Sequence, residues 1–288
     1  MLFKSLVCCA VLFAPAGPLA AGDTVAVLSS ASGVYLEAFS KFQAGSVDKI
    51  PYFDISREKL LLPPGTRTVV AFGSKAARQT YPPAINLVYL LAPGYFVDWD
   101  KRSGATVKVS MLTPAERLLT GLKELQPKLK KLIVFWRSSA YADLLGDYPS
   151  ALTGVEVRTV QVKRADQLPG LLRSVIGSAD AFWLPPDPLL ISQESIKIFR
   201  DFSLSNAIPM YVSTKGLAQK GACAAIGVSF AEMGAEASAA VKKLSKGISL
   251  PRVIYPANSQ LTINVSAAKR CRLSFSSEVT AKAASLLP

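Results

Sequence analysis

Continuous apolar, β-branched runs alternate with stretches of helical spacing along most of the chain. The runs of strand length lie at Thr24–Leu28, Thr68–Phe72, Asn86–Leu91, Leu132–Trp136, Ala181–Leu184 and Pro209–Val212. Strands that are apolar on both faces are typical of parallel sheets covered by helices on each side. The pattern therefore predicts an α/β protein with doubly wound parallel sheets. The 288 residues are enough for two domains of this kind.

Three of the intervening stretches carry clear helix signals. The segment TPAE predicts a capping box between Thr113 and Glu116, with Pro114 at the first position of a helix over 114–126. A second helix is expected to begin near Ser192, and a third to span Phe230–Leu244. These helices supply apolar stripes that can cover the faces of the predicted sheets.

The first 22 residues follow the plan of a secretory signal peptide. Lys4 precedes an apolar run from Leu6 to Ala14, and small residues follow at Ala20 and Ala21. A membrane anchor is disfavoured because a span needs about 20 apolar residues, roughly twice this run. We therefore expect residues 1–22 to be removed and the mature protein to be periplasmic.

Composition narrows the classes of function. Hydrophobic residues make up 50% of the chain and charged residues 18%, as in globular proteins. The chain has no histidine, which excludes histidine bases, Ser-His-Asp nucleophiles and histidine metal ligands. The formal charge of +13 is dispersed, without a basic stripe that has aromatic residues interleaved. We therefore expect no nucleic-acid partner.

Motifs for catalysis or cofactors are nearly absent. The chain has no GxGxxG, GxxxxGK[ST] or GxSxG pattern. Asp98–Asp100 is interpreted as a solvated loop rather than a cation site. A hydroxyl beside an amine, at Ser74–Lys75 and Thr214–Lys215, leaves a Ser-Lys hydrolase formally open, but neighbouring residues rarely point the same way. We predict a binding protein without cofactor or metal, not an enzyme.

Two cysteines remain after the signal, Cys223 and Cys271. In an oxidising compartment they could form one disulfide. Two separate buried thiols are an equally good interpretation, because the sequence gives no distance between them.

Several segments of the second half resemble a known family. They read ADAFWLPPDPLL at 179–190, IPMYVSTKGLAQKGACAAIGVSFAEMG at 208–234 and LTINVSAAKRCRL at 261–273, with LKKLIVFW at 129–136 before them. Their order and character resemble the tryptophan/tyrosine-type ABC transporter substrate-binding proteins over about half of the chain. The resemblance implies a type I periplasmic-binding-protein fold, in which two α/β lobes joined by three crossovers clamp a ligand in the cleft.

The resemblance also implies the division of the chain. We expect an N-terminal lobe of residues 23–112 plus 224–248 and a C-terminal lobe of residues 113–223 plus 249–288. The first half departs from the family pattern, because residues 40–67 are short for a complete strand-helix-strand unit. The turn at 92–94 and the loop at Lys215 lack acidic residues that would suit an amino group, whereas Asp187 is retained.

Small polar residues follow the predicted strands, and in open α/β sheets the carboxyl edge is where ligands bind. The expected cleft residues are Ser30, Ser32, Tyr35, Ser74 and Tyr95 in one lobe and Arg137, Ser139, Asp187 and Thr214 in the other. Arg137 suits a carboxylate or phosphate, and the tyrosines offer flat faces. Lys75 and Lys215 either add positive potential or point to solvent. The set favours a small polar organic molecule, anionic rather than zwitterionic.

The resulting hypothesis is a monomeric periplasmic solute-binding protein that closes on its ligand and delivers it to a membrane ABC permease. An alternative on the same fold is a periplasmic sensing or accessory module that presents its ligand to another receptor without a permease. The trimmed N-terminal lobe and the altered acidic positions motivate this alternative.

Overall fold

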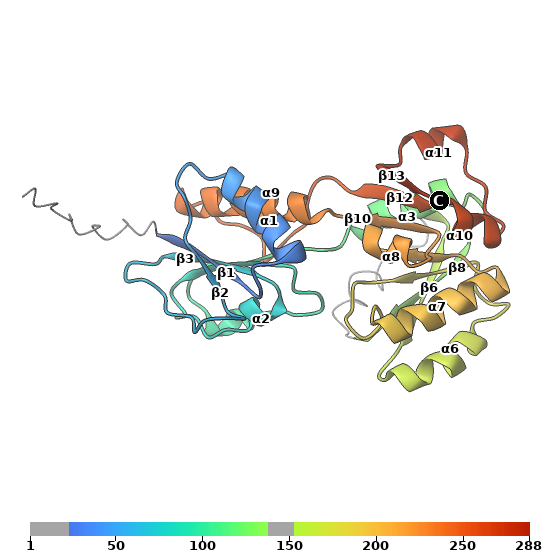
Figure 1. Cartoon of the computed structure of the whole chain (residues 1–288), viewed down its shortest axis with the longest axis horizontal. Helices are drawn as coiled ribbons and strands as arrows, with labels where there is room; N and C mark the ends of the chain where they lie inside the picture. The colour runs from blue at the N-terminus through green and yellow to red at the C-terminus, as the bar shows by residue number, and fades with distance from the viewer. Residues whose placement is uncertain (1–22, 138–152) are drawn as a thin grey trace, which may run out of the picture.

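The predicted strands assemble into two separate sheets, and each sheet forms one lobe (Figure 1). This computed structural model describes residues 23–137 and 153–288. All six runs predicted as strands are strands in the structure, with bounds that shift by one residue at most. The predicted α/β class with two mostly parallel sheets is therefore confirmed.

The N-terminal lobe contains a six-stranded sheet of order β11-β5-β4-β3-β1-β2. Its strands are β1 (Thr24–Leu28), β2 (Tyr52–Asp54), β3 (Thr68–Phe72), β4 (Asn86–Leu90), β5 (Thr106–Val109) and β11 (Val253–Ile254). Every neighbouring pair in this order is parallel. On one face lie α1 (Gly33–Ala44) and α9 (Phe230–Ser245), which pack side by side. The other face is covered by the short helix α2 (Ser74–Ala77) and by loops, which include η1 (Trp99–Lys101).

The C-terminal lobe contains a seven-stranded sheet of order β13-β12-β10-β9-β8-β6-β7. Its strands are β6 (Lys131–Trp136), β7 (Glu156–Gln161), β8 (Ala181–Leu184), β9 (Met210–Val212), β10 (Ala224–Gly227), β12 (Gln260–Asn264) and β13 (Ser285–Leu287). The β10–β12 pair is antiparallel and the other pairs are parallel. Among the described helices of either lobe, none combines the length and apolar character that a membrane crossing requires.

Helices cover both faces of this second sheet. One face packs against α3 (Ala115–Leu125), α10 (Val265–Arg270) and α11 (Ser277–Ala281). The opposite face packs against α6 (Leu168–Ser174), α7 (Gln193–Asn206) and α8 (Lys215–Gln219), and η2 (Ala165–Gln167) leads into α6. The apolar runs of the sequence thus become strands that are buried from both sides, as continuous hydrophobic strands require.

The described chain passes between the lobes three times: from β5 to α3, from β10 to α9 and from β11 to β12. Two of the expected boundaries move. Strand β10, expected in the N-terminal lobe, pairs with β9 and β12 in the second sheet. Strand β11, expected in the C-terminal lobe, adds to the edge of β5 in the first sheet. Each of these short strands pairs within the sheet of the lobe from which the chain is about to cross.

The link between β2 and β3 is short, as the sequence indicated. Residues 55–67 form turns and extended segments, and no helix occurs among them. Backbone hydrogen bonds from Ile55 to Leu28 and from Arg57 to Asp54 hold the start of this link. One strand-helix-strand unit of the N-terminal lobe is therefore reduced to a strand and a loop.

The predicted start of the first long helix is wrong by one residue. Helix α3 begins at Ala115, and Pro114 rather than Thr113 occupies the N-cap position. Proline has no side-chain acceptor for the free N–H groups of the first turn. Thr113 is 7% exposed, and its hydroxyl has no hydrogen-bond partner among the described residues. The capping box is therefore not formed, because the backbone carries Thr113 out of reach of the helix N–H groups.

The two remaining cysteines lie together in the core of the C-terminal lobe. Cys223 and Cys271 are both buried, and both are free thiols. The Cys271 thiol also lies 3.4 Å from the Ser203 hydroxyl. Its hydrogen bond to Cys223, together with burial, raises the pKa of the Cys223 thiol. The pair is thus a contact within one lobe, not a tether between lobes.

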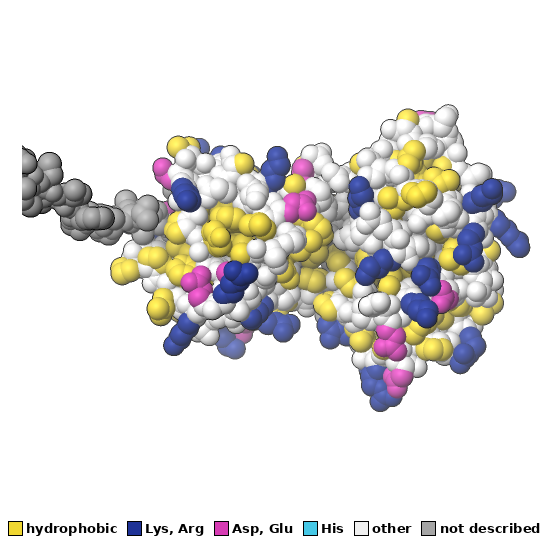
Figure 2. All heavy atoms as spheres, viewed as in Figure 1, with side chains coloured by type: hydrophobic (Ala, Val, Ile, Leu, Met, Phe, Trp, Pro, Cys, Tyr) yellow, Lys and Arg dark blue, Asp and Glu magenta, His cyan; other side chains and the backbone are white. Residues whose placement is uncertain are grey.

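Figure 2 shows two rounded bodies that meet at a narrower waist. On this face Lys and Arg side chains are spread over both lobes rather than gathered in a stripe. Apolar side chains come to the surface near the waist, where the crossovers run.

Candidate functional site

The N-terminal lobe presents its predicted polar residues at the carboxyl ends of β1 and β3. The hydroxyls of Ser30 and Ser32 lie 2.8 Å apart, and Ser32 is the N-cap of α1. Gly73, with φ of 101°, lets the chain pass so close that an added Cβ would meet the Tyr35 ring at 2.5 Å. Ser74 follows as the first residue of α2. Four of the five predicted residues of this lobe thus gather at one edge of the sheet.

Tyr95 does not join that group. Its ring packs with Tyr89 at a centroid distance of 6.2 Å, and the Arg78 guanidinium lies 5.0 Å from its centroid. It belongs to the apolar cluster on the sheet face opposite to the one that Tyr35 covers. The two tyrosines therefore lie on different faces of the sheet. The sequence predicted only that both follow strands, which does not fix the face.

The loop that carries Tyr95 is held by a buried lysine. Lys108 on β5 is 7% exposed, and its Nζ donates to the Tyr95 carbonyl oxygen at 2.9 Å. The same ammonium lies 3.7 Å from the centroid of the Phe96 ring. Burial lowers the pKa of Lys108 to about 8. The cation thus fixes the loop after β4 by a hydrogen bond and a cation–π contact.

In the C-terminal lobe the predicted arginine and aspartate bind each other. The Arg137 Nε donates to both carboxylate oxygens of Asp187, at 3.1 and 3.2 Å. The Asp187 side chain is fully buried and also accepts the Leu189 N–H, whereas the Arg137 side chain is 48% exposed. Asp187 therefore serves as an anchor beneath Arg137. Ser139, the residue predicted beside them, lies outside the described residues.

A pocket of about 270 Å³ lies where β9, β10 and β12 reach the edge of the second sheet. We call it the cleft pocket. Most of the residues that line it have polar side chains, and they come from both lobes: Glu37, Ser213, Thr214, Lys215, Gly216, Gln219, Ala225, Gly227, Val228, Ser229, Phe230, Gln260 and Thr262. Glu37 belongs to α1, Ser229 is the N-cap of α9, and Phe230 is the first residue of that helix. Val228 lies in the second crossover, and the other residues precede that crossover or follow the third.

The most informative residue of the cleft pocket is Ser213. It is 1% exposed, and its hydroxyl has no hydrogen-bond partner among the described residues. A buried hydroxyl without a partner costs free energy, so a ligand group that reached it would offset that cost. Beside it, Gly227 is required by packing, because an added Cβ would lie 1.7 Å from the Ser213 carbonyl oxygen.

Of the predicted site residues that the structure describes, Thr214 is the one that lines this pocket. Sequence analysis missed Glu37, Ser213 and the polar residues Gln260 and Thr262. Ser213 was within reach, because it directly follows a predicted strand as Thr214 does. Gln260 and Thr262 were not, because only the antiparallel pairing of β12 with β10 brings them to this edge.

The two hydroxyl–amine pairs are not coupled. The Lys75 ammonium donates to the Ile55 carbonyl oxygen at 3.2 Å, and the Lys215 ammonium donates to the Ser285 hydroxyl at 3.0 Å. Each lysine thus has another partner than the hydroxyl that precedes it. The two neighbouring carboxylates each pair with a cationic side chain. The Lys101 ammonium lies 2.9 Å from the Asp98 carboxylate, and the Arg252 guanidinium lies 3.8 Å from the Asp100 carboxylate.

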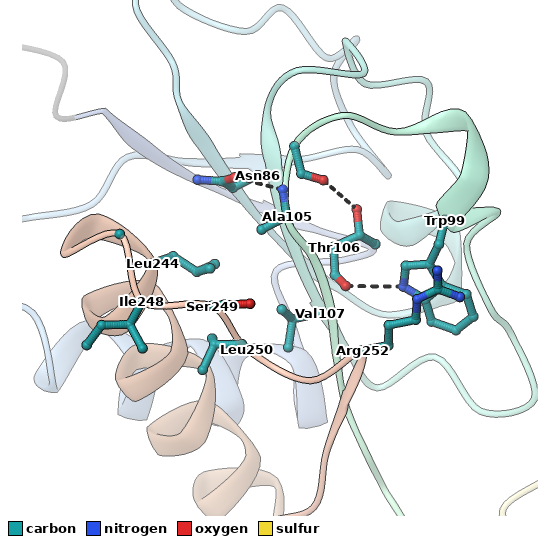
Figure 3. A pocket seen from close by; sticks show the side chains of 12 residues that line it. Asn86, Trp99, Ala105, Thr106, Val107, Leu244, Ile248, Ser249, Leu250 and Arg252 are labelled. Atoms are coloured by element: carbon teal, nitrogen blue, oxygen red, sulfur yellow. Dashed lines mark hydrogen bonds between the residues drawn. The ribbon is translucent and has the colours of Figure 1, made fainter.

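A second hollow, of about 400 Å³, lies at the opposite end of the N-terminal sheet (Figure 3). We call it the outer hollow. It is formed where β4 and β5 begin and where α9 ends, with Asn86, Thr106 and Leu244 in its wall. Arg252 lies over the Trp99 indole at 5.3 Å, and the Trp99 Nε1 donates to the Thr106 carbonyl oxygen at 3.1 Å. The Asn86 side-chain oxygen accepts the Ala105 N–H at 3.0 Å, and the hollow faces away from the strand carboxyl ends.

Comparison with known proteins agrees with this geometry. A family profile described as ABC transporter substrate binding protein matches residues 56–287. Among curated proteins, none matches by sequence. A Streptococcus pneumonia ABC domain solved in complex with L-Trp is 18% identical, with a TM-score of 0.63, over 92% of this chain and 100% of that one.

Two further solved structures extend the comparison. One is the ligand-free, open form of a substrate-binding protein with adhesive properties from Clostridium difficile, at 15% identity and a TM-score of 0.66, over 92% of this chain and 99% of that one. The other is a glucose-galactose binding protein from Geobacillus stearothermophilus, at 12% identity and a TM-score of 0.52, over 83% and 96%. At these identities the likeness establishes the fold, with two lobes around a cleft.

Proposed function

The chain belongs to the ABC transporter substrate-binding protein family, and from this premise we propose that it captures a small polar organic molecule in the cleft pocket and delivers it to a membrane permease. Residues 1–22 would direct it to the periplasm and be removed. Binding would bring the lobes together, because the cleft pocket takes side chains from both. The observation that carries the proposal is the buried Ser213 hydroxyl in the pocket wall, which has no partner among the described residues.

The chemistry of the pocket favours a ligand with hydrogen-bonding groups around a small carbon skeleton. Hydroxyls and amides make up most of the polar lining, and Phe230 supplies an apolar surface. The N-terminus of α9 opens into it at Ser229, which favours a negatively charged group on the ligand. The ammonium of Lys215 adds to the same preference, whereas Glu37 on the other wall suits a donor. We therefore propose an anionic group near Lys215 and a hydroxyl or amino group near Glu37.

The experiment begins with the ligand that the cell supplies. Native mass spectrometry of the gently isolated protein should show one small molecule bound per chain, which denaturation releases. Calorimetric titration of that molecule into the stripped protein should then give a defined dissociation constant. Ser213→Ala and Lys215→Ala should each weaken binding by about tenfold, because each removes a contact to a polar or charged ligand group.

The matched control is Lys197→Ala, since Lys197 is an exposed lysine of the same lobe on α7. It changes the net charge as Lys215→Ala does, but its side chain is not part of the pocket lining. Equal affinities of the Lys215→Ala and Lys197→Ala variants for the ligand would mean that no anionic group of the ligand binds near Lys215. An unchanged affinity for Ser213→Ala would show that the ligand binds elsewhere.

One observation favours a second candidate function on the same fold. Between β2 and β3 the N-terminal lobe has only a loop at 55–67, where a complete strand-helix-strand unit would have a helix. This changes one outer surface of the lobe, and a receptor other than a permease could use that surface. The two functions differ in genetic context: genes for a permease and an ATPase beside this gene favour transport, and a receptor gene favours sensing.

A further inference from the structure

A third cavity, of about 180 Å³, lies at the hinge between the lobes. We call it the hinge cavity. Leu112, Thr113, Pro114 and Ala115 come from the first crossover and the start of α3, Tyr255 comes from the third crossover, and Leu118 and Trp183 come from the C-terminal lobe. It shares no residue with the cleft pocket or the outer hollow. The guanidinium of Arg117, one turn into α3, donates to the carbonyl oxygens of Pro256 and Ala257 and so joins the two crossovers beside it.

Two of the residues that line this cavity each carry a buried polar group that has no hydrogen-bond partner among the described residues. They are the Thr113 hydroxyl and the Trp183 indole N–H, and these residues are 7% and 2% exposed. Each such group carries the cost of losing its bonds to water. Two of them in one small cavity indicate a common partner, and the indole N–H can only donate.

The start of α3 adds further donors. The first N–H groups of a helix have no acceptor inside the helix, and the N-cap residue Pro114 offers no side-chain acceptor. The eleven residues of α3 give this end a positive partial charge. The cavity wall thus combines an indole donor, a hydroxyl and an uncapped helix N-terminus, and it contains no carboxylate.

The rest of the wall is apolar, because Leu112, Leu118 and the Trp183 ring face a volume of about 180 Å³. We propose that the hinge cavity is a second ligand site, which binds a small carboxylate with an apolar or aromatic body. The carboxylate accepts from the Trp183 N–H, the Thr113 hydroxyl and the start of α3, and the body packs against the leucines. Charge-assisted bonds of this kind are stronger than neutral ones. This site does not depend on which molecule the cleft pocket takes.

Benzoate is the probe, and benzamide is its neutral counterpart of similar shape. The protein carries the three tryptophans Trp99, Trp136 and Trp183, so its nitrogen-15 spectrum has three indole signals. Comparison with Trp183→Phe assigns the one that reports on the cavity. Benzoate should shift the Trp183 signal saturably in the millimolar range or below, and benzamide should bind at least about tenfold more weakly. A Trp183 signal that does not move, or a shift that grows linearly without saturation, would overturn the proposal.

Thr113→Val supplies the variant test, with Ser238→Ala as its matched control. Ser238 is also a buried hydroxyl without a partner among the described residues, but it lies on α9 against α1, away from the hinge. Each substitution removes an unpaired hydroxyl, so neither should lower the melting temperature. Only Thr113→Val should weaken benzoate, by about tenfold. Equal benzoate affinities for the two variants would contradict the proposed site. So would saturable binding of benzoate elsewhere on the protein while the hinge cavity holds only water.

Discussion

The two lobes solve the same packing problem in different ways. In the C-terminal lobe, helices cover both faces of the sheet, and the apolar clusters on the two faces are built almost entirely of aliphatic and aromatic side chains. In the N-terminal lobe, a tight pair of long helices covers one face, and loops with one short helix cover the other. That second face also holds Tyr81 and Tyr89, and burial raises the pKa of each phenol well above its usual value. It lies beside the buried Lys108.

The two lobes contribute unequally to the proposed ligand site. The strand ends of the well-covered C-terminal lobe supply most of the cleft pocket, so this half of the site is preorganised. The N-terminal lobe contributes Glu37 and the start of α9, both from its helix pair. If the chain captures its ligand as proposed, we expect the C-terminal lobe to bind first and the helix pair of the other lobe to close over the ligand.

The largest effect is expected where the N-terminal helix pair is tightest. An added Cβ at Gly234 of α9 would lie 2.0 Å from the Ala38 carbonyl oxygen of α1. Because that neighbour is backbone, the helices must separate, and Gly234→Ala should cost about 3 kcal/mol of unfolding free energy. Urea unfolding followed by circular dichroism measures it.

The same substitution in the other lobe should have the opposite sign. Gly170 lies in α6, and no atom comes within 4 Å of its added Cβ. Gly170→Ala should stabilise the protein by about 0.5–1 kcal/mol, because alanine favours the helix. If Gly234→Ala and Gly170→Ala lowered the free energy of unfolding equally, the close packing of α9 against α1 would not be what sets the two positions apart.

The buried lysine of the N-terminal lobe gives the next effect. The pKa of Lys108 is lowered from 10.5 to about 8 by burial, so the unfolded chain holds the proton more tightly than the folded one. The charge therefore destabilises the fold fully below pH 8, and this cost disappears as the pH rises to 10.5. Lys108→Met should add about 2 kcal/mol of stability at pH 7, after allowance for the lost bond to Tyr95, and this gain should disappear as the pH rises to 10.5.

Urea unfolding of both proteins at pH 7, 9 and 10.5 measures this dependence. Lys131→Met serves as the control, because Lys131 is exposed at the start of β6 in the C-terminal lobe. It should show no such pH dependence. A constant difference between Lys108→Met and the wild type at all three pH values would mean that desolvation of the ammonium is not the cause.

The ion pair at the edge of the C-terminal sheet should give a smaller effect than the buried lysine. Arg137→Ala leaves the fully buried Asp187 carboxylate without its guanidinium. The cost should be about 1 kcal/mol, because the arginine is half exposed and water can replace part of its contact. Adding Asp187→Asn should recover most of the loss, as the amide oxygen can still accept the Leu189 N–H.

Differential scanning calorimetry of the single and double variants tests this pair. Arg158→Ala on the neighbouring strand β7 is the control, since the Arg158 guanidinium donates to the Ser178 hydroxyl rather than to a buried carboxylate. A double variant no more stable than Arg137→Ala would show that the carboxylate charge is not what makes the loss.

Much of the fold could be predicted because it follows from short-range patterns. Runs of apolar residues predict the strands, and helical periodicity predicts the three long helices. The side chains of Ser192 and Ser229 each accept a backbone N–H and so cap their helices. The TPAE segment failed because a capping box requires the threonine at the N-cap, and the crossover places Pro114 there. Sequence alone does not show how a chain enters a helix from a hinge.

The site was harder to predict because it depends on faces and pairings. That Tyr35 and Tyr95 both follow strands was evident, but their separation on opposite faces comes from the geometry of the loops. Arg137 was expected to hold a ligand, and the sequence could not show that Asp187 lies beneath it. Gln260 reaches the cleft pocket only through long-range antiparallel pairing.

Hydrogen exchange with and without the molecule found by native mass spectrometry shows whether the two lobes share the ligand site. Binding in the cleft pocket should slow exchange at 213–216 in the C-terminal lobe, at 227–230 at the second crossover, and around Glu37 on α1. Residues 104–107 and 247–252 around the outer hollow should be unaffected. Protection confined to the outer hollow, with none at 213–216, would contradict a ligand site shared by the two lobes.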